Sequence, residues 1–117
     1  MPSSSRNFKE DARFRVLRLI EKDGRLTQRQ MAKALGLSLG AVNYCLKGLI
    51  EKGAIKASNF QASNSKWRYA YALTPTGIAE KASLTVHYLA RRRREYEALC
   101  EEIEAITRDV QQNGDNG

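Results

Sequence analysis

Residues 27–53, TQRQMAKALGLSLGAVNYCLKGLIEKG, decide the fold of this chain. Thr27 and Gln30 have the spacing of a capping box, which marks the start of a helix. Gly36 follows the last apolar residue of that helix and can supply the left-handed conformation with which many helices end. Ser38 then caps a second helix. The stretch therefore predicts two short helices joined by a tight turn, a helix-turn-helix.

The second helix has two different faces when its residues are placed about 100° apart. The apolar face contains Val42, Cys45, Leu46, Leu49 and Ile50. The opposite face contains Gly40, Asn43, Tyr44, Lys47 and Glu51. Most of this second face can form hydrogen bonds, and the glycine lets a partner approach closely. A helix that reads bases in the major groove of DNA needs such a face.

Charge is divided unevenly along the chain. Residues 1–74 contain 14 Lys and Arg against 5 Asp and Glu, a net charge of +9, whereas residues 75–117 contain 6 against 8, a net charge of −2. A basic segment around the helix-turn-helix suits a surface that neutralises phosphates. Charge alone is equally consistent with a basic face that is merely solvated. The choice between a phosphate-binding surface and a solvated face therefore depends on the helix-turn-helix.

Several classes of protein are disfavoured by the sequence. It has no apolar run long enough to span a membrane and no signal peptide, so we expect a cytoplasmic protein. Cys45 and Cys100 lack the spacing of metal ligands, and no metal site or cofactor is predicted. The single histidine, His87, has no nucleophile or paired carboxylates near it in the sequence, so no catalytic residue is predicted and we do not expect an enzyme.

A helix is expected to precede the motif, and a β-hairpin to follow it. Asn7 with Glu10 repeats the capping-box spacing and opens a helix that Asp23-Gly24 ends. The Arg25-Leu26 link then has the character of a third strand. After Gly53, AIKASNF and the alternating KWRYAYAL predict two strands around a polar tip, QASNS. Two strands directly after a helix-turn-helix form the wing of a winged helix.

The last predicted helix carries a seam of heptad spacing. Thr74 is its N-cap and Pro75 its first residue. A helix of about 35 residues would be roughly 52 Å long, too long for its far half to pack on so small a domain. We therefore expect a homodimer through the seam residues. They are Leu89, Arg92, Tyr96, Leu99, Ile103, Ile106 and Val110.

Charges beside the seam favour an antiparallel dimer. Arg91 to Arg94 come before an acidic run that begins at Glu97. Antiparallel pairing centred near Ala98 places the arginines of one copy beside the glutamates of the other, whereas parallel pairing places like charges together. A polybasic patch that binds phosphate is the alternative reading of the four arginines.

The chain resembles the MarR-like winged-helix transcriptional regulators, and within them a subgroup associated with exopolysaccharide gene clusters. The resemblance rests on LTQRQMAKALGLSLGAVNYCLKGLIEKGAIK, the wing and YALTPTGIAEKA. It implies that Leu39 to Lys52 is the recognition helix, that Gln61 to Arg68 form the wing, and that the protein controls transcription of polysaccharide genes. MarR-type proteins commonly dimerise through helices from both ends of a longer chain and bind small ligands between the dimer and DNA-binding parts. We expect no additional helix before Phe8 and only one helix after the wing, so the ligand sensing of the family is not carried over. No small-molecule effector is predicted.

The sequence thus predicts a mainly α fold with a small β wing, a winged helix-turn-helix followed by a long C-terminal dimerisation helix. The expected parts are a disordered start (1–6), the DNA-binding domain (7–74), the coiled-coil helix (75–110) and a disordered tail (111–117).

Double-stranded DNA is the expected partner. The residues predicted to face the groove are Ser38, Leu39, Gly40, Asn43, Tyr44 and Lys47. Those predicted to hold phosphates or form the wing contact are Thr27, Gln28, Arg29, Lys33, Asn64, Ser65, Lys66 and Arg68. The alternative function is a winged helix that docks other proteins and does not bind DNA.

Overall fold

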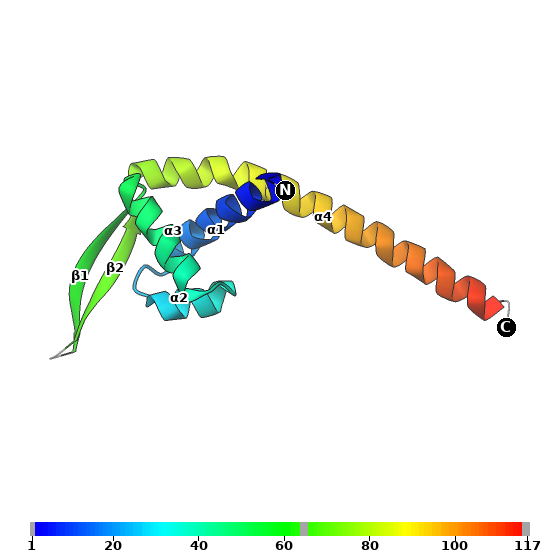
Figure 1. The fold of residues 1–117 in the computed structure, drawn as a ribbon, viewed down its shortest axis with the longest axis horizontal. Coiled ribbons are helices and arrows are strands. Elements are labelled where there is room, and N and C mark those ends of the chain that lie inside the picture. Colours follow the sequence, from blue (N-terminus) through cyan, green and yellow to red (C-terminus); the bar gives the residue numbers. More distant parts are fainter. Residues whose placement is uncertain (1, 64–65, 116–117) are drawn as a thin grey trace. The chain divides into compact units, whose positions relative to one another are not determined.

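The structure is a computed structural model that describes residues 2–63 and 66–115, with the side chains of residues 7–61, 63, 66 and 68–114. Three helices precede a two-stranded hairpin, and a long helix follows it (Figure 1). The elements are α1 Pro2–Lys22, α2 Gln28–Leu35, α3 Leu39–Glu51, β1 Ile55–Ser63, β2 Lys66–Leu73 and α4 Pro75–Asp115. The predicted winged helix-turn-helix with a long C-terminal helix is confirmed.

The predicted caps of the helix-turn-helix are present. The Gln30 N–H donates to Thr27 Oγ1 at 3.1 Å, and the Thr27 N–H donates to Gln30 Oε1 at 2.8 Å. Gly36 has a φ of 66°, in the left-handed region that favours glycine. Ser38 Oγ accepts from the Ala41 N–H at 3.0 Å. These bonds join residues close in sequence, which is why the spacing predicted them.

Both long helices extend beyond their expected bounds. α1 begins at Pro2 and not at Asn7, so the Asn7 capping box does not open it, and residues 2–6 are helical where disorder was expected. Proline suits the first turn of a helix, because its fixed φ is helical and no N–H is needed there. α4 continues past Val110 to Asp115, into the segment expected to be a disordered tail.

The wing is an antiparallel hairpin whose register runs from Ile55 opposite Leu73 to Gln61 opposite Trp67. β1 continues to Ser63, beyond Phe60 where the first strand was expected to end. The third strand expected at Arg25-Leu26 is wrong, because the sheet of the described residues has two strands.

The core lies where α1, α2 and α3 meet the base of the hairpin. Its buried residues are Val16, Leu17, Ile20, Met31, Ala32, Val42, Cys45, Leu46, Leu49, Ala54, Ile55 and Tyr71. Four of the five residues predicted for the apolar face of α3 are among them. Ile50, the fifth, is 44% exposed, since it lies at the flank of that face.

Cys45 is a core thiol, and burial is the main reason that its pKa is raised to about 11. We expect a thiol reagent at pH 8 to modify Cys100 quickly and Cys45 slowly in the native protein, and both quickly in denaturant. Because the folded pKa exceeds 9.0, the value for an ordinary thiol, the stabilisation from neutral Cys45 should be complete below about pH 9 and decline toward pH 11. Equal native rates for both thiols would contradict this placement.

Two glycines allow backbone segments to meet closely around the hairpin. The Tyr71 N–H donates to Gly24 O at 2.8 Å, and a Cβ on Gly24 would lie 1.9 Å from Tyr71 O. The start of α4 repeats this arrangement, since a Cβ on Gly77 would lie 1.9 Å from Ala54 O. Any larger residue at these two positions would push the hairpin away from its neighbours.

The chain divides into two compact units, Met1–Thr85 and Val86–Gly117. The first contains the winged helix-turn-helix and the beginning of α4, where Leu84 packs against the core. Lys81 in this part also forms an ion pair with Glu21 of α1 at 2.8 Å. The second unit contains the remaining part of α4.

Candidate nucleic-acid interface

The face of α3 opposite the core is open to solvent. Tyr44 is 69% exposed, and Gly40 and Lys47 are also exposed. A Cβ on Gly40 would meet nothing within 4 Å, so the backbone at this point is accessible. Ser38 and Leu39 are exposed at the N-terminal end of the helix, where the backbone N–H groups favour an anion.

Asn43 lies on the flank of this face that is turned toward α2. Its Nδ2 donates to Gln28 Oε1 at 3.2 Å, and Gln28 Nε2 donates to the Tyr71 hydroxyl at 3.5 Å. Gln28 was predicted as a phosphate contact, but its carboxamide bonds to α3 and β2. Sequence reasoning missed this connection because it joins residues far apart in the chain.

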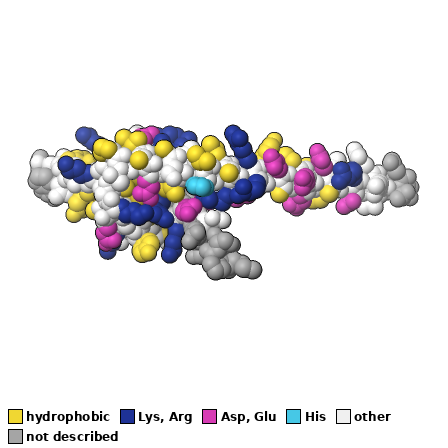
Figure 2. All heavy atoms as spheres, turned by 90° about the horizontal axis from the view of Figure 1, so that it is seen from above, with side chains coloured by type: hydrophobic (Ala, Val, Ile, Leu, Met, Phe, Trp, Pro, Cys, Tyr) yellow, Lys and Arg dark blue, Asp and Glu magenta, His cyan; other side chains and the backbone are white. Residues whose placement is uncertain are grey.

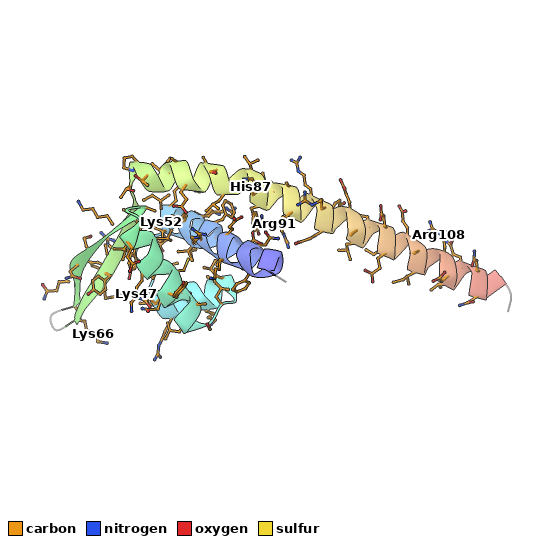
Figure 3. All side chains as sticks on the ribbon, turned by 45° about the horizontal axis from the view of Figure 1, so that its top comes forward. Lys47, Lys52, Lys66, His87, Arg91 and Arg108 are labelled. Atoms are coloured by element: carbon orange, nitrogen blue, oxygen red, sulfur yellow. The ribbon has the colours of Figure 1, made fainter. Side chains whose placement is uncertain are left out.

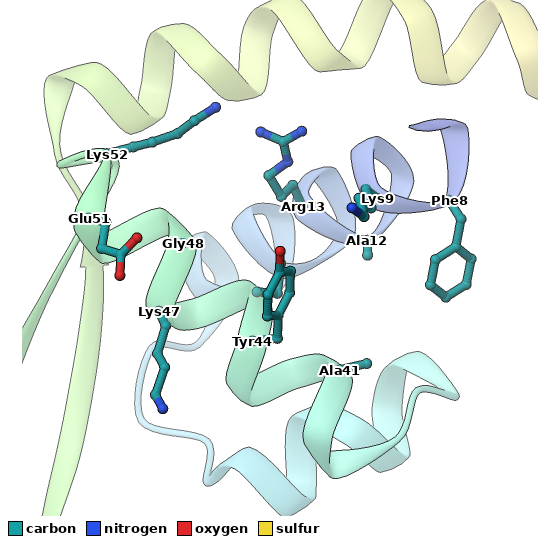
Figure 4. A pocket seen from close by; sticks show the side chains of 11 residues that line it. Phe8, Lys9, Ala12, Arg13, Ala41, Tyr44, Lys47, Gly48, Glu51 and Lys52 are labelled. Atoms are coloured by element: carbon teal, nitrogen blue, oxygen red, sulfur yellow. The ribbon is translucent and has the colours of Figure 1, made fainter. Parts of the chain in front are cut away.

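Tyr44 lies on the other flank, toward α1. Its ring lines a pocket of about 520 Å³ between α1 and α3, together with Phe8, Ala12 and Gly48. Figure 4 shows the Tyr44 ring turned toward α1, whereas Lys47 points away from it. Asn43, Tyr44 and Lys47 therefore leave the helix in three directions.

The basic residues of α2 remain available to a partner. Arg29 and Lys33 are exposed one turn apart, so they lie on the same face of the helix. Thr27 differs from them, because its oxygen accepts the capping bond from Gln30 and its O–H is the group left for a phosphate.

The two cations predicted for the wing are in different settings. Lys66 is exposed and lies toward the far end of the hairpin (Figure 3). Arg68 turns back toward the domain, where its Nη2 donates to Arg25 O at 3.3 Å and to Gln30 Oε1 at 3.5 Å. It therefore braces the hairpin against α2, a role that the sequence pattern did not indicate. Asn64 and Ser65 lie outside the described residues.

Sequence reasoning also missed a charge cluster at the back of α3. Glu80 of α4 accepts from Arg13 and from Lys52, each at 3.4 Å. The cluster ties α1, the end of α3 and the start of α4 together. Arg13 and Lys52 are thus engaged within the domain and add little to a phosphate-binding surface.

The second unit presents the predicted seam as an unpartnered apolar stripe. Apolar, acidic and basic side chains are interspersed along the far part of α4 (Figure 2). The exposed fractions are 46% for Leu89, 68% for Tyr96, 53% for Leu99, 54% for Ile103, 53% for Ile106 and 65% for Val110. Arg92, the polar seam residue, forms an ion pair with Glu95 at 2.8 Å. Among residues 86–115, the part of unit 2 that the structure describes, there is no second element that could cover the stripe.

Neither a metal site nor a membrane-spanning helix is present among the described residues. No three His, Cys, Asp or Glu side chains there gather closely enough to hold a metal ion. No helix in the same part of the chain has the length and apolar character needed to cross a membrane.

Known proteins share this architecture. Residues 9–56 match the family model described as winged helix-turn-helix DNA-binding. The fold class is therefore the winged helix-turn-helix, as the sequence indicated. No curated protein sequence gives a significant match.

Solved regulators have similar structures. The adhesin competence repressor AdcR of Streptococcus pyogenes is 22% identical with a TM-score of 0.60, and the match covers 86% of this chain and 75% of that one. MepR of Staphylococcus aureus, solved in complex with DNA, is 26% identical with a TM-score of 0.58, covering 75% of this chain and 60% of MepR. A MarR/EmrR family regulator from Acinetobacter sp. ADP1 is 18% identical with a TM-score of 0.59, covering 90% and 75%. The chain thus shares the fold of MarR-type regulators, which is the broader part of the predicted resemblance.

Proposed function

We propose that this protein is a sequence-specific double-stranded DNA-binding transcriptional regulator that acts as a homodimer. The observation that carries the proposal is the exposed face of α3, where Gly40 and Lys47 are open to solvent and Asn43 projects from one flank. Arg29, Lys33 and Lys66 supply exposed cations on the neighbouring α2 and wing. Such a combination suits base readout by α3 together with phosphate contacts from α2 and the wing. The similarity to MepR, a regulator solved with DNA, supports it.

The proposed interface assigns different roles to α3 and the wing. Asn43 reads a base edge, whereas Lys66 contacts the phosphate backbone. Ser38, Leu39 and the helix N-terminus lie where a phosphate or base edge at the groove would meet them. By the resemblance to the exopolysaccharide-associated subgroup, genes for polysaccharide biosynthesis are the proposed targets.

These roles predict different effects of two substitutions. Lys66→Ala should weaken binding to all duplexes alike and reduce the salt slope of log K by about one unit, because one phosphate contact is lost. Asn43→Ala should instead relax preference at one base pair, at a cost of about 1–3 kcal/mol for the preferred sequence. Titrations of the selected site and of random duplex DNA at several salt concentrations would separate the two effects.

Lys56→Ala is the matched control for Lys66→Ala. Lys56 is exposed on the same hairpin but pairs with Ala72 near its base. The Lys56→Ala substitution should leave both the affinity for DNA and the salt slope almost unchanged. If Lys56→Ala and Lys66→Ala have the same effect, the wing contact is assigned wrongly. If the wild-type chain binds no duplex but binds a protein partner, the docking function replaces the proposed one.

The proposed dimer joins two copies of unit 2. Its stripe exposes six large apolar side chains, each by 46% or more. A single exposed helix face of this kind is unfavourable in water, and heptad spacing allows a second identical helix to cover it.

Antiparallel pairing of the two helices is the proposed arrangement. Centred near Ala98, it places Tyr96 of one copy level with Leu99 of the second copy. Arg92 then faces an apolar layer, near Glu102 of the second copy, and does not meet another Arg92. Parallel pairing would bring the two Arg92 guanidinium groups together in the seam.

A further inference from the structure

Three polar side chains connect β2, α2 and α3 at the edge of the proposed interface. Tyr71 is only 8% exposed, so its hydroxyl is a fixed point in the domain. Gln28 is half-buried and donates to that hydroxyl through Nε2 at 3.5 Å. The other end of the same carboxamide, Oε1, accepts from Asn43 Nδ2 at 3.2 Å.

The order of donors and acceptors in this chain orients the Asn43 carboxamide. Gln28 Oε1 is an acceptor, so it must receive a hydrogen bond from its neighbour. Nδ2 is the only group of the Asn43 side chain that can donate one. The Asn43 NH₂ is therefore held toward α2. The two ends of its carboxamide can exchange only if the Gln28 carboxamide turns with it, so that the Tyr71 O–H donates to Gln28. In both arrangements the bond to Gln28 holds the Asn43 side chain in one place and leaves it at least one donor and one acceptor.

The groups of Asn43 that remain match one base. The bond to Gln28 uses one of the two Nδ2 hydrogens and leaves the other hydrogen and Oδ1. A carboxamide that presents one donor beside one acceptor is complementary to adenine, whose N7 accepts and whose N6 amino group donates in the major groove. Guanine offers two acceptors at the same edge and cannot pair with Oδ1.

We propose that Gln28, held by Tyr71, is a positioning residue that fixes Asn43 for recognition of an adenine in each half-site. The inference rests on the proposed DNA binding and on Asn43 as the base-reading residue. It changes the role of Gln28 from a phosphate contact, which would be independent of sequence, to a determinant of specificity at one base pair.

The test measures discrimination at a single position. A preferred duplex is first selected from random DNA, and each of its base pairs is then replaced in turn. The wild-type protein should lose about tenfold or more in affinity when the adenine contacted by Asn43 is replaced. Asn43→Ala should remove this difference at that position alone. Gln28→Leu should reduce it at the same position to within about threefold, and the double variant should show no further loss, because the two residues act as one unit.

Gln28→Glu is the matched variant, because a carboxylate can still accept from Asn43 Nδ2 and from the Tyr71 O–H. It should keep the preference for adenine, although its charge weakens binding to every duplex. Tyr71→Phe should lower the preference partially by freeing Gln28. Thermal unfolding by circular dichroism would establish that each variant is folded before its preference is compared.

Three outcomes would overturn the inference. One is unchanged discrimination in Gln28→Leu, and another is an equal loss by that variant on all duplexes, as a phosphate contact would give. The third is a preferred base other than adenine at the position sensitive to Asn43. These results differ from failure of the proposed function, in which the wild-type chain would bind no duplex at all.

Discussion

Leu99→Asp should convert the proposed dimer to a monomer. Leu99 is a central seam residue with 53% of its surface exposed in the single chain, and pairing would bury two copies of it. Because about half of each side chain is still exposed, burying both contributes on the order of 1.5–3 kcal/mol to dimerisation, and a buried carboxylate in their place would be unfavourable in addition. Sedimentation at micromolar concentration should show the mass of one chain.

Loss of the dimer should also weaken binding to a two-half-site operator. A linked second domain raises the overall affinity by about 10²-fold or more, and a monomer loses this gain while its affinity for a single half-site remains. Ala98→Asp provides the control, because it adds the same charge one residue away on the exposed side of the helix opposite the seam. A Leu99→Asp protein that remains dimeric would place the interface elsewhere.

The direction of the two helices can be measured in the same protein with Cys100 replaced by serine. For antiparallel pairing, a mixture of Tyr96→Cys and Leu99→Cys chains should form a covalent heterodimer on oxidation, and neither variant alone should cross-link efficiently. Efficient cross-linking of Leu99→Cys with itself would indicate parallel pairing and contradict the proposed arrangement.

Gly24→Ala should destabilise the winged domain by about 2–4 kcal/mol. A Cβ at this position would lie 1.9 Å from Tyr71 O, so the turn after α1 would have to separate from β2. The separation breaks the bond from the Tyr71 N–H to Gly24 O and adds the strain of overpacking. For a domain of this size, thermal unfolding should show a decrease in Tm of at least about 10 °C.

Gly48→Ala is the contrasting substitution. Gly48 lies inside α3, at the start of its last turn, and a Cβ there would meet nothing within 4 Å. Alanine is the better helix former, so this variant should gain about 0.5–1 kcal/mol of stability. Similar stability losses in both variants would show that the close approach of Gly24 to β2 is not what holds the hairpin.

The helix caps, the heptad seam and Gly24 together show how much of the fold the sequence could predict. The helix-turn-helix caps depend on residues three positions apart, so their hydrogen bonds are readable from spacing alone. The heptad seam is equally local in its pattern, because helical periodicity decides which side chains share a face. Nothing in the local sequence around Gly24, however, indicates that its neighbour is Tyr71, a residue of the later strand.

The candidate interface also combines features that the local sequence predicts with features that depend on distant contacts. Sequence periodicity placed Asn43, Tyr44 and Lys47 on one face of a helix, and the structure leaves that face outside the core. The direction of each side chain depends on the elements beside α3. Asn43 is held toward α2 by Gln28, and Tyr44 lies in the pocket next to α1.

By itself, then, the sequence determined the two capped helices, the hairpin after them and the apolar seam of the last helix, because short-range hydrogen bonds and periodicity specify these features. The tertiary structure alone decided that Arg68 braces the wing and that Gln28 orients Asn43. Both depend on contacts between residues distant in the chain, and such contacts exist only once the helices and the hairpin have packed around a common core.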